Sequence, residues 1–108
     1  MSENQRIPQL LQFLEDDPND PFLLYALATE YQNVDVEQAI PYFEKLLEEH
    51  PDYTATYYHA AVLYAELEEN EKAEATFKEG IRRCEEAEEG KALQEIKNAY
   101  QNFLFEIE

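Results

Sequence analysis

An internal repeat constrains this chain more than any other feature of its sequence. One order of residues, in which apolar or small residues precede an aromatic and Ala precedes a second aromatic, occurs twice with a shift of 33 to 34 residues. The first copy comprises Leu24, Leu27, Ala28, Tyr31, Ala39, Phe43 and Pro51, and the second comprises Tyr57, Ala60, Ala61, Tyr64, Ala73, Phe77 and Gly80. A repeat of this period is typical of a helix–turn–helix unit that must stack on a neighbour to bury its apolar face.

The spacing of apolar residues predicts an all-α protein. Only two of the 108 residues are glycine, and the apolar residues recur at three and four positions, which is the period of a helix face. No segment alternates between apolar and polar residues in the manner of a strand. A chain of this length forms one domain.

The two copies resemble the signature of the tetratricopeptide repeat family. That signature places an aromatic or Leu, a Leu, a small residue and Tyr on one helix, followed by Ala, an aromatic and a small residue on the next. The resemblance covers about two thirds of the chain and implies an α-α superhelix of about six helices. It divides residues 1–108 into an N-terminal capping half repeat (7–18), two repeats (20–51 and 52–86) and a C-terminal capping helix (90–107).

Local signals give the expected helix ends. Asp20 followed by Pro21 predicts an N-cap and a first helical proline. Asp35, with Gln38 three residues later, indicates a capping box for a helix over 36–49, and Asn70 is the expected cap within the second repeat.

Two departures from the repeat pattern fall in the first copy. The distance from Tyr31 to Ala39 is one residue shorter than that from Tyr64 to Ala73, which predicts a shorter turn. Pro41 lies inside an expected helix, so we predict a bend there or a helix whose regular part begins later.

The terminal helices each carry an apolar face. The first is expected to pack through Leu10, Leu11, Phe13 and Leu14. The last carries a stripe of Leu93, Ile96, Tyr100, Phe103, Leu104 and Ile107. Lys97 occupies the position of Ala28 and Ala61, where a paired helix would need a small residue, and this favours a capping role.

The net charge of −17 excludes several partner classes. With 25 acidic and eight basic residues, the chain repels nucleic acid and anionic membrane surfaces. We expect a cytoplasmic protein, because no apolar run is long enough to cross a bilayer and the N-terminus lacks the pattern of a signal peptide. The single cysteine agrees with a reducing compartment.

The sequence predicts no catalytic, cofactor or metal site. His50, His59 and Cys84 do not share a metal-ligand spacing, and no nucleophile and base stand in a known pairing. The paired glutamates lack the spacing of a calcium loop and are interpreted as a solvated face. Cys84 beside two arginines is interpreted as a packing residue, with a redox-active thiol as the less favoured alternative.

The resemblance also implies a concave groove, lined by the first helices of successive repeats, that holds a peptide or helix of a partner protein. Matched positions give the groove residues Phe22, Tyr25, Thr29, Gln32, Tyr58, His59, Val62, Ala65, Lys91, Gln94 and Asn98. Tyr25 and Tyr58 lie outside the packing stripes and are the strongest candidates, with packing between helices as an equal alternative. A clamp for chaperone tails, known in one subclass, is absent, because Lys91 alone matches it.

Three interpretations therefore remain for the whole protein. The first is a protein-binding module for a basic or apolar segment, which suits the acidic surface. The second is self-assembly as a homo-oligomer through a terminal helix that carries Phe103, Phe105 and Ile107. An enzyme or metal protein is the third and is disfavoured by the residues present. The acidity itself is interpreted as a general surface property, as in proteins of a high-salt cytoplasm, because the acids lie mainly outside the groove positions.

Overall fold

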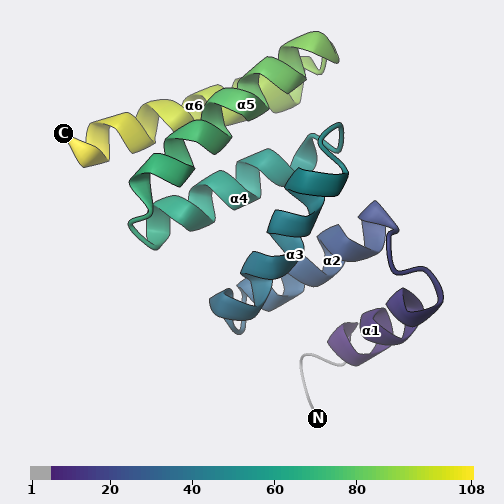
Figure 1. The fold of residues 1–108 in the computed structure, drawn as a ribbon. Coiled ribbons are helices and arrows are strands. Elements are labelled where there is room, and N and C mark those ends of the chain that lie inside the picture. Colours follow the sequence, from purple (N-terminus) through teal and green to yellow (C-terminus); the bar gives the residue numbers. More distant parts are fainter. Residues whose placement is uncertain (1–5) are drawn as a thin grey trace. The chain divides into compact units, whose positions relative to one another are not determined.

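Six helices make up the part of the chain that the structure describes. The structure is a computed structural model that describes residues 6–108, and it contains no strand within that range. The helices are α1 (Arg6–Asp16), α2 (Pro21–Gln32), α3 (Val36–Glu49), α4 (Ala55–Glu66), α5 (Asn70–Glu86) and α6 (Gly90–Ile107) (Figure 1). The predicted all-α class is confirmed, and so are the predicted ranges of α3 and α6.

The helices fall into two compact units, which are described separately. Unit 1 (Met1–Tyr53) contains α1, α2 and α3, and unit 2 (Thr54–Glu108) contains α4, α5 and α6. In unit 1, α2 packs against both α1 and α3. In unit 2, α5 packs against both α4 and α6, and α4 also contacts α6 (Figure 1). The division after Tyr53 lies close to the predicted boundary between the two repeats.

The core of unit 1 consists mainly of the predicted repeat residues. Leu24, Leu27, Ala28, Ala39 and Phe43 are buried, and Leu46 joins them. On α1, Ile7 and Leu10 form a cluster with Leu27, and Leu11 and Leu14 pack against its edge.

The predicted contribution of Phe13 to this core is wrong. Its side chain is 59% exposed. Ile7, Leu10 and Leu14 follow each other at three and four residues and so define the buried stripe of α1, whereas Phe13 lies to one side of that stripe.

The core of unit 2 also follows the repeat. Its buried residues include Tyr57, Ala60, Ala61, Tyr64, Ala73, Phe77, Gly80, Ile96 and Phe103. The ring of Phe77 lies 5.4 Å from the rings of both Tyr100 and Phe103, which joins α5 to α6. The predicted burial of Ile107 is wrong, since it is 45% exposed. It is the last residue of α6, which has 18 residues against 12 in α4. α6 is therefore longer than α4 by about 9 Å. This difference agrees with an exposed C-terminal end of α6, against which α4 does not pack.

Gly80 allows α5 to approach both neighbouring helices. A Cβ atom at this position would lie 2.5 Å from the Cδ1 atom of Ile96 and 2.5 Å from the Cβ atom of Tyr57. Real side chains do not approach so closely, so this contact between α5, α4 and α6 requires glycine. The equivalent position in unit 1 is the buried Leu46.

The starts of the helices agree only in part with the sequence. Asp20 caps α2 by accepting a hydrogen bond from the Phe22 N–H at 2.8 Å, and Pro21 is the first helical residue, as predicted. The predicted capping box of α3 is wrong in its bonding, because the Gln38 amide donates to the Asp35 carboxylate at 2.9 Å and this carboxylate accepts no backbone N–H. The prediction that Asn70 is the N-cap of α5 is wrong by one residue, because Glu69 is the N-cap and Asn70 is the first helical residue.

The turns of unit 2 place two glutamates in the left-handed region. Glu68 follows α4 with φ of 61°, and Glu88 follows α5 with φ of 57°. After each, a backbone N–H reaches back five residues, from Glu69 to the Tyr64 carbonyl at 2.9 Å and from Glu89 to the Cys84 carbonyl at 3.1 Å. Both turns are therefore Schellman motifs, which usually have glycine at the left-handed position.

The first repeat closes its turn in another way. Asn33, after α2, has an ordinary right-handed conformation, and the N–H groups of Val34 and Asp35 both donate to the Tyr31 carbonyl.

The predicted shorter turn is wrong, because three residues join α2 to α3 and three residues join α4 to α5. The shorter spacing lies in the helix instead, since α2 ends one residue after Tyr31 and α4 ends two residues after Tyr64. Of the two outcomes predicted for Pro41, a late start of the helix is wrong, because α3 begins at Val36 and includes Pro41, and a bend stays a prediction.

Candidate functional site

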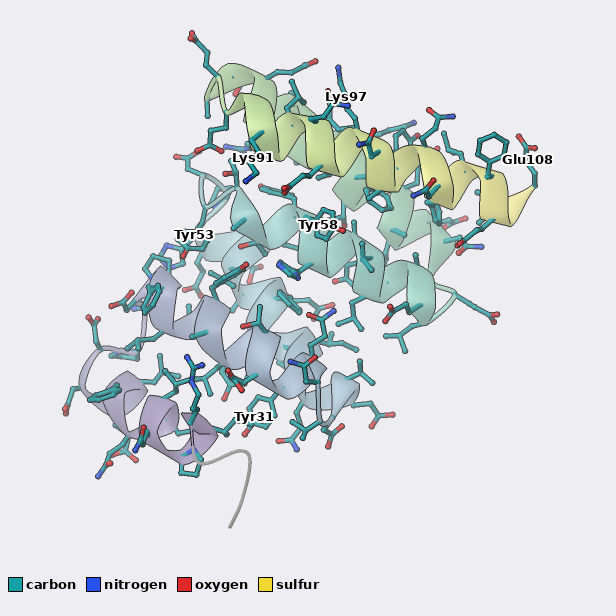
Figure 2. All side chains as sticks on the ribbon, turned by 180° about the vertical axis from the view of Figure 1, so that it is seen from behind. Tyr31, Tyr53, Tyr58, Lys91, Lys97 and Glu108 are labelled. Carbon is teal, nitrogen blue, oxygen red and sulfur yellow. The ribbon has the colours of Figure 1, made fainter. Side chains whose placement is uncertain are left out.

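An open hollow lies between α4 and α6 of unit 2. Its volume is about 490 Å³. α4 contributes Tyr58, Val62, Ala65 and Glu66, and α6 contributes Glu95, Asn98, Ala99, Asn102, Phe103 and Glu106. Phe77 of α5 completes the lining. In Figure 2, Tyr58 projects from α4 on the side of α6.

The lining of the hollow combines three kinds of side chain. Phe77 and Phe103 are almost fully buried, so they present an apolar base, and Tyr58 is 39% exposed beside it. The amides of Asn98 and Asn102 offer hydrogen-bond donors and acceptors. Glu66, Glu95 and Glu106 are exposed and bring negative charge, whereas no Lys or Arg belongs to the lining. Such a surface fits a ligand that has both an apolar and a polar part.

The glutamates of the hollow differ in their partners from Glu74, Glu79 and Glu86 of α5. On α5, Glu79 pairs with Arg82 at 2.5 Å and with Arg83 at 2.8 Å, and Glu74 lies 3.6 Å from Lys78. Over residues 6–108, no ion pair is found for Glu66, Glu95 or Glu106. The negative charge of the hollow is therefore not neutralised from within unit 2.

Four of the seven groove residues predicted in unit 2 meet at this hollow. Tyr58, Val62 and Ala65 come from α4, and Asn98 comes from α6. The other three, His59, Lys91 and Gln94, do not line it. Gln94 donates to the Asn98 side chain at 3.3 Å, and Lys91 is exposed near the start of α6.

His59 lies beside the hollow, and its ring is half-buried. Its ring lies 5.4 Å from the ring of Tyr58 in an edge-on arrangement. Burial disfavours the charged imidazole and so lowers the pKa of His59 below its usual value of 6.5. The surroundings of this histidine therefore favour its neutral form.

The residues that sequence reasoning missed belong mostly to α6. Glu95, Asn102 and Glu106 stand three before, four after and eight after Asn98, so they share its helix face. Applying this spacing to Asn98 would have found them. Phe77 and Phe103 gave no such signal, because their pattern is that of core residues.

The four groove residues predicted in unit 1 have different surroundings. Phe22 is 63% exposed, and Tyr25, Thr29 and Gln32 are half-buried. The Thr29 hydroxyl donates to the carbonyls of Tyr25 and Ala26 in its own helix, at 3.1 and 3.0 Å. This bond occupies the hydroxyl proton, so Thr29 has only acceptor capacity left for a ligand.

Tyr25 packs against another tyrosine of unit 1. Its ring centroid lies 5.5 Å from that of Tyr53, with the planes inclined by 59°. Burial raises the pKa of Tyr25, and the neighbouring Tyr53 raises it further. Packing was one of the two interpretations of Tyr25, and the contact with Tyr53 supports it.

The polar groups that might have carried chemistry are dispersed. Cys84 is buried, and this burial, reinforced by Glu89, raises the pKa of its thiol, whereas a redox-active thiol would need a lowered pKa. His50 ends α3, and the buried Nε2 atom of its ring has no hydrogen-bond partner in the described structure. Within residues 6–108, no three His, Cys, Asp or Glu side chains are grouped as metal ligands would be.

None of the helices described for this chain has the length and apolarity needed to cross a membrane. This holds for α6 as well, which is the longest of them at 18 residues.

Comparison with known proteins identifies the family. Residues 30–95 match the family model described as tetratricopeptide repeat. A crystal structure of a tetratricopeptide repeat domain protein from Salinibacter ruber is 39% identical, with a TM-score of 0.74, and the match covers 78% of this chain and 94% of that one. A solution NMR structure of a tetratricopeptide repeat domain protein from the same organism is 40% identical, with a TM-score of 0.74 and coverages of 81% and 89%. No curated protein matches. On the family match and the level of identity, this chain belongs to the tetratricopeptide repeat family.

Proposed function

We propose that this protein is a non-catalytic module that binds a peptide or a helix of a partner protein. Tetratricopeptide repeats generally mediate interactions between proteins and are typically non-catalytic. The observation that carries the proposal is the hollow between α4 and α6, where four predicted groove residues meet. A partner that is neither nucleic acid nor membrane accords with the net charge of −17, and a cytoplasmic location is part of the same proposal.

The shape and lining of the hollow support binding of a side chain from the partner. Its volume of about 490 Å³ lies within the usual range of ligand sites, about 300–1,000 Å³. Tyr58 supplies a rigid aromatic surface with a polar tip, a combination that is frequent at the energetic centres of interfaces. Phe77 and Phe103 belong to the core, so the base of the hollow needs little ordering when a ligand binds.

Peptide selection tests this function directly. The immobilised protein is offered a random-peptide library, and the dissociation constant of each enriched peptide is measured by fluorescence anisotropy. Tyr58→Ala is expected to weaken binding by about tenfold or more, because it removes the exposed wall of the hollow. Phe13→Ala, which truncates an exposed aromatic of unit 1, serves as the matched control and should leave the affinity unchanged. Failure to enrich any peptide, or equal binding by the two variants, would contradict the proposal.

Self-assembly is the second candidate function. Phe105 is 71% exposed and Ile107 is 45% exposed, and both lie at the end of α6. Exposed apolar residues of this size are often covered by a partner. Multi-angle light scattering at micromolar concentration distinguishes the candidates. A dimer that is lost in a Phe105→Ser variant would favour assembly, whereas a monomer would exclude it.

A further inference from the structure

We infer that the hollow between α4 and α6 accepts a partner segment in which an apolar side chain is flanked by lysine or arginine. This inference rests on the proposed function and adds the chemical nature of the ligand. The base of the hollow, formed by Phe77 and Phe103, requires an apolar group. The charge around that base determines which side chains of the partner segment can flank its apolar group.

The charge around the hollow has one sign and no internal partner. Glu66 belongs to α4, and Glu95 and Glu106 belong to α6, so negative groups come from both of the helices that enclose the hollow. None of the three takes part in an ion pair within the described chain. A cationic segment would therefore find free carboxylates on both sides, and an acidic segment would be repelled from both.

Among the described glutamates of unit 2, only Glu74, Glu79 and Glu86 take part in ion pairs, so the glutamates of the hollow are set apart by their place around an apolar base. Four cations lie on α5, and three of them, Lys78, Arg82 and Arg83, pair with glutamates of the same helix. The fourth, Lys72, lies over the ring of Tyr64 at 5.6 Å. Lys91 stands four residues before Glu95, yet no ion pair joins them among residues 6–108. These cations therefore do not neutralise the glutamates of the hollow, and a partner can do so.

The amides add a means of holding the backbone of the segment. Asn98 and Asn102 stand one turn apart on α6 and lie between Glu95 and Glu106 along the helix. Their side chains can both donate to and accept from a peptide group. Such contacts do not depend on the sequence of the partner, so the apolar and cationic side chains are left to determine specificity.

A second copy of this chain does not fit the description. Most of its lysines and arginines stand beside apolar residues that are already buried, such as Lys45 beside Leu46, Arg83 beside Cys84, and Lys97 beside Ile96, and the apolar neighbours of Arg82 and Lys91 are half-buried. Exposing any of these side chains would disrupt the core. The segment therefore belongs to a different protein.

Matched peptides test the inference. The ligand is a short fluorescent peptide with two leucines flanked by lysines. One comparison peptide has glutamates in place of the lysines, and another has serines in place of the leucines. We expect only the first to bind, and we expect high salt to weaken its binding because screening shortens the reach of the carboxylates.

Matched protein variants separate the hollow from the general negative field. The triple variant Glu66→Gln, Glu95→Gln, Glu106→Gln removes the carboxylates of the hollow. The control Glu71→Gln, Glu85→Gln, Glu88→Gln removes three exposed carboxylates of α5 and the turn after it, none of which lines the hollow, and changes the net charge by the same amount. We expect the first variant to weaken the leucine–lysine peptide by about tenfold or more and the control by less than about twofold.

Four outcomes would overturn the inference, and the first three differ from a failure of the proposed function. Equal loss in both triple variants would mean that the general charge attracts the peptide. Equal binding of the glutamate peptide would mean that charge plays no part. Library peptides that are neutral or acidic and that depend on Tyr58 would leave the proposed function intact while removing the inference. Peptides indifferent to Tyr58 would remove both.

Discussion

The two helical hairpins that carry the repeat, α2–α3 and α4–α5, bury matched positions with different volumes. Unit 1 has Leu24 on the first helix and Leu46 on the second, and both are buried. Unit 2 has Tyr57 and Gly80 at these positions, and the backbone of Gly80 lies against the Tyr57 side chain. A larger residue on one helix thus accompanies a smaller one on the other. The same positions are therefore buried in both repeats, but the sizes of the side chains at these positions differ between the two hairpins.

The turns of the two hairpins also differ, in this case in their backbone conformation. Both join their helices with three residues, yet only that of unit 2 uses a left-handed residue, Glu68. In unit 1 the N–H groups of Val34 and Asp35 share one carbonyl. The same pairing of helices is therefore reached through two backbone conformations.

Removing the matched phenylalanines should have the largest effect. Phe43→Ala and Phe77→Ala each delete a side chain that is 1% exposed, and each should lower the free energy of unfolding by about 3–5 kcal/mol. Urea unfolding followed by circular dichroism measures the loss. Hydrogen exchange should show reduced protection first in the unit that contains the substitution. Equal loss of protection in all helices would mean that the two units unfold as one.

Replacing a helical glycine with alanine usually stabilises a protein, but Gly80→Ala should destabilise this one. Its new Cβ atom would overlap Tyr57 and Ile96, at an expected cost of about 1–3 kcal/mol. Tyr57→Leu should not rescue this variant, because the overlapping Tyr57 atom is Cβ. Gly90→Ala is the control, since a Cβ atom there meets nothing within 4 Å, and it should stabilise α6 by about 0.5–1 kcal/mol. Thermal unfolding of the two variants should shift in opposite directions.

Glycine at the left-handed turn positions should stabilise unit 2 alone. Glu68→Gly and Glu88→Gly relieve a positive φ, and each should add about 0.5–1 kcal/mol. Asn33→Gly, at the matched turn of unit 1, should give no gain, because φ there is −84°. Chemical denaturation measures all three. A gain for Asn33→Gly would show that the two turns do not differ in strain.

The smallest expected effect concerns the ion pairs of α5. Hydrogen bonds from Arg82 and then Arg83 lower the pKa of Glu79 from 4.5 to about 2. A lowered pKa stabilises the folded state above the unfolded value of 4.5, and this contribution is lost as the pH falls from 4.5 towards 2. Glu79→Gln should therefore reduce stability slightly at pH 7 and flatten the dependence of the melting temperature between about pH 5 and 2. The side chains are well exposed, so the effect should be small and should diminish in high salt. Glu85→Gln, which removes another exposed carboxylate of α5, should leave the slope unchanged.

Much of the fold was predictable because its signals are local. Asp20, Pro21 and the spacing of the repeated aromatics determine where helices begin and which faces are buried, and these require only neighbouring residues. The left-handed glutamates gave no such signal, since glutamate is not a residue that favours positive φ. The close approach at Gly80 depends on Ile96, which lies on another helix, and sequence spacing does not reveal such a distance.

The candidate site was predictable only in part for a related reason. Tyr58, Val62, Ala65 and Asn98 were carried over from family positions, and they line one hollow. Glu79 and Glu95 look alike in the sequence, since each has a cation four residues away. Glu79 precedes Arg83 and pairs with it, whereas Lys91 precedes Glu95, which is the less favourable order on a helix. The charge left unpaired around the hollow follows from such details of side-chain geometry.

The buried thiol of Cys84 gives unit 2 a built-in reporter of its own opening. It is the only sulfhydryl of the chain and is 1% exposed, so an alkylating reagent can reach it only while α5 is transiently undocked. The rate of its labelling under native conditions measures how often that happens. A ligand held between α4 and α6 should slow this rate in proportion to its occupancy, and no added dye or tag is needed. A residue that packs in the core thus offers a direct measure of binding.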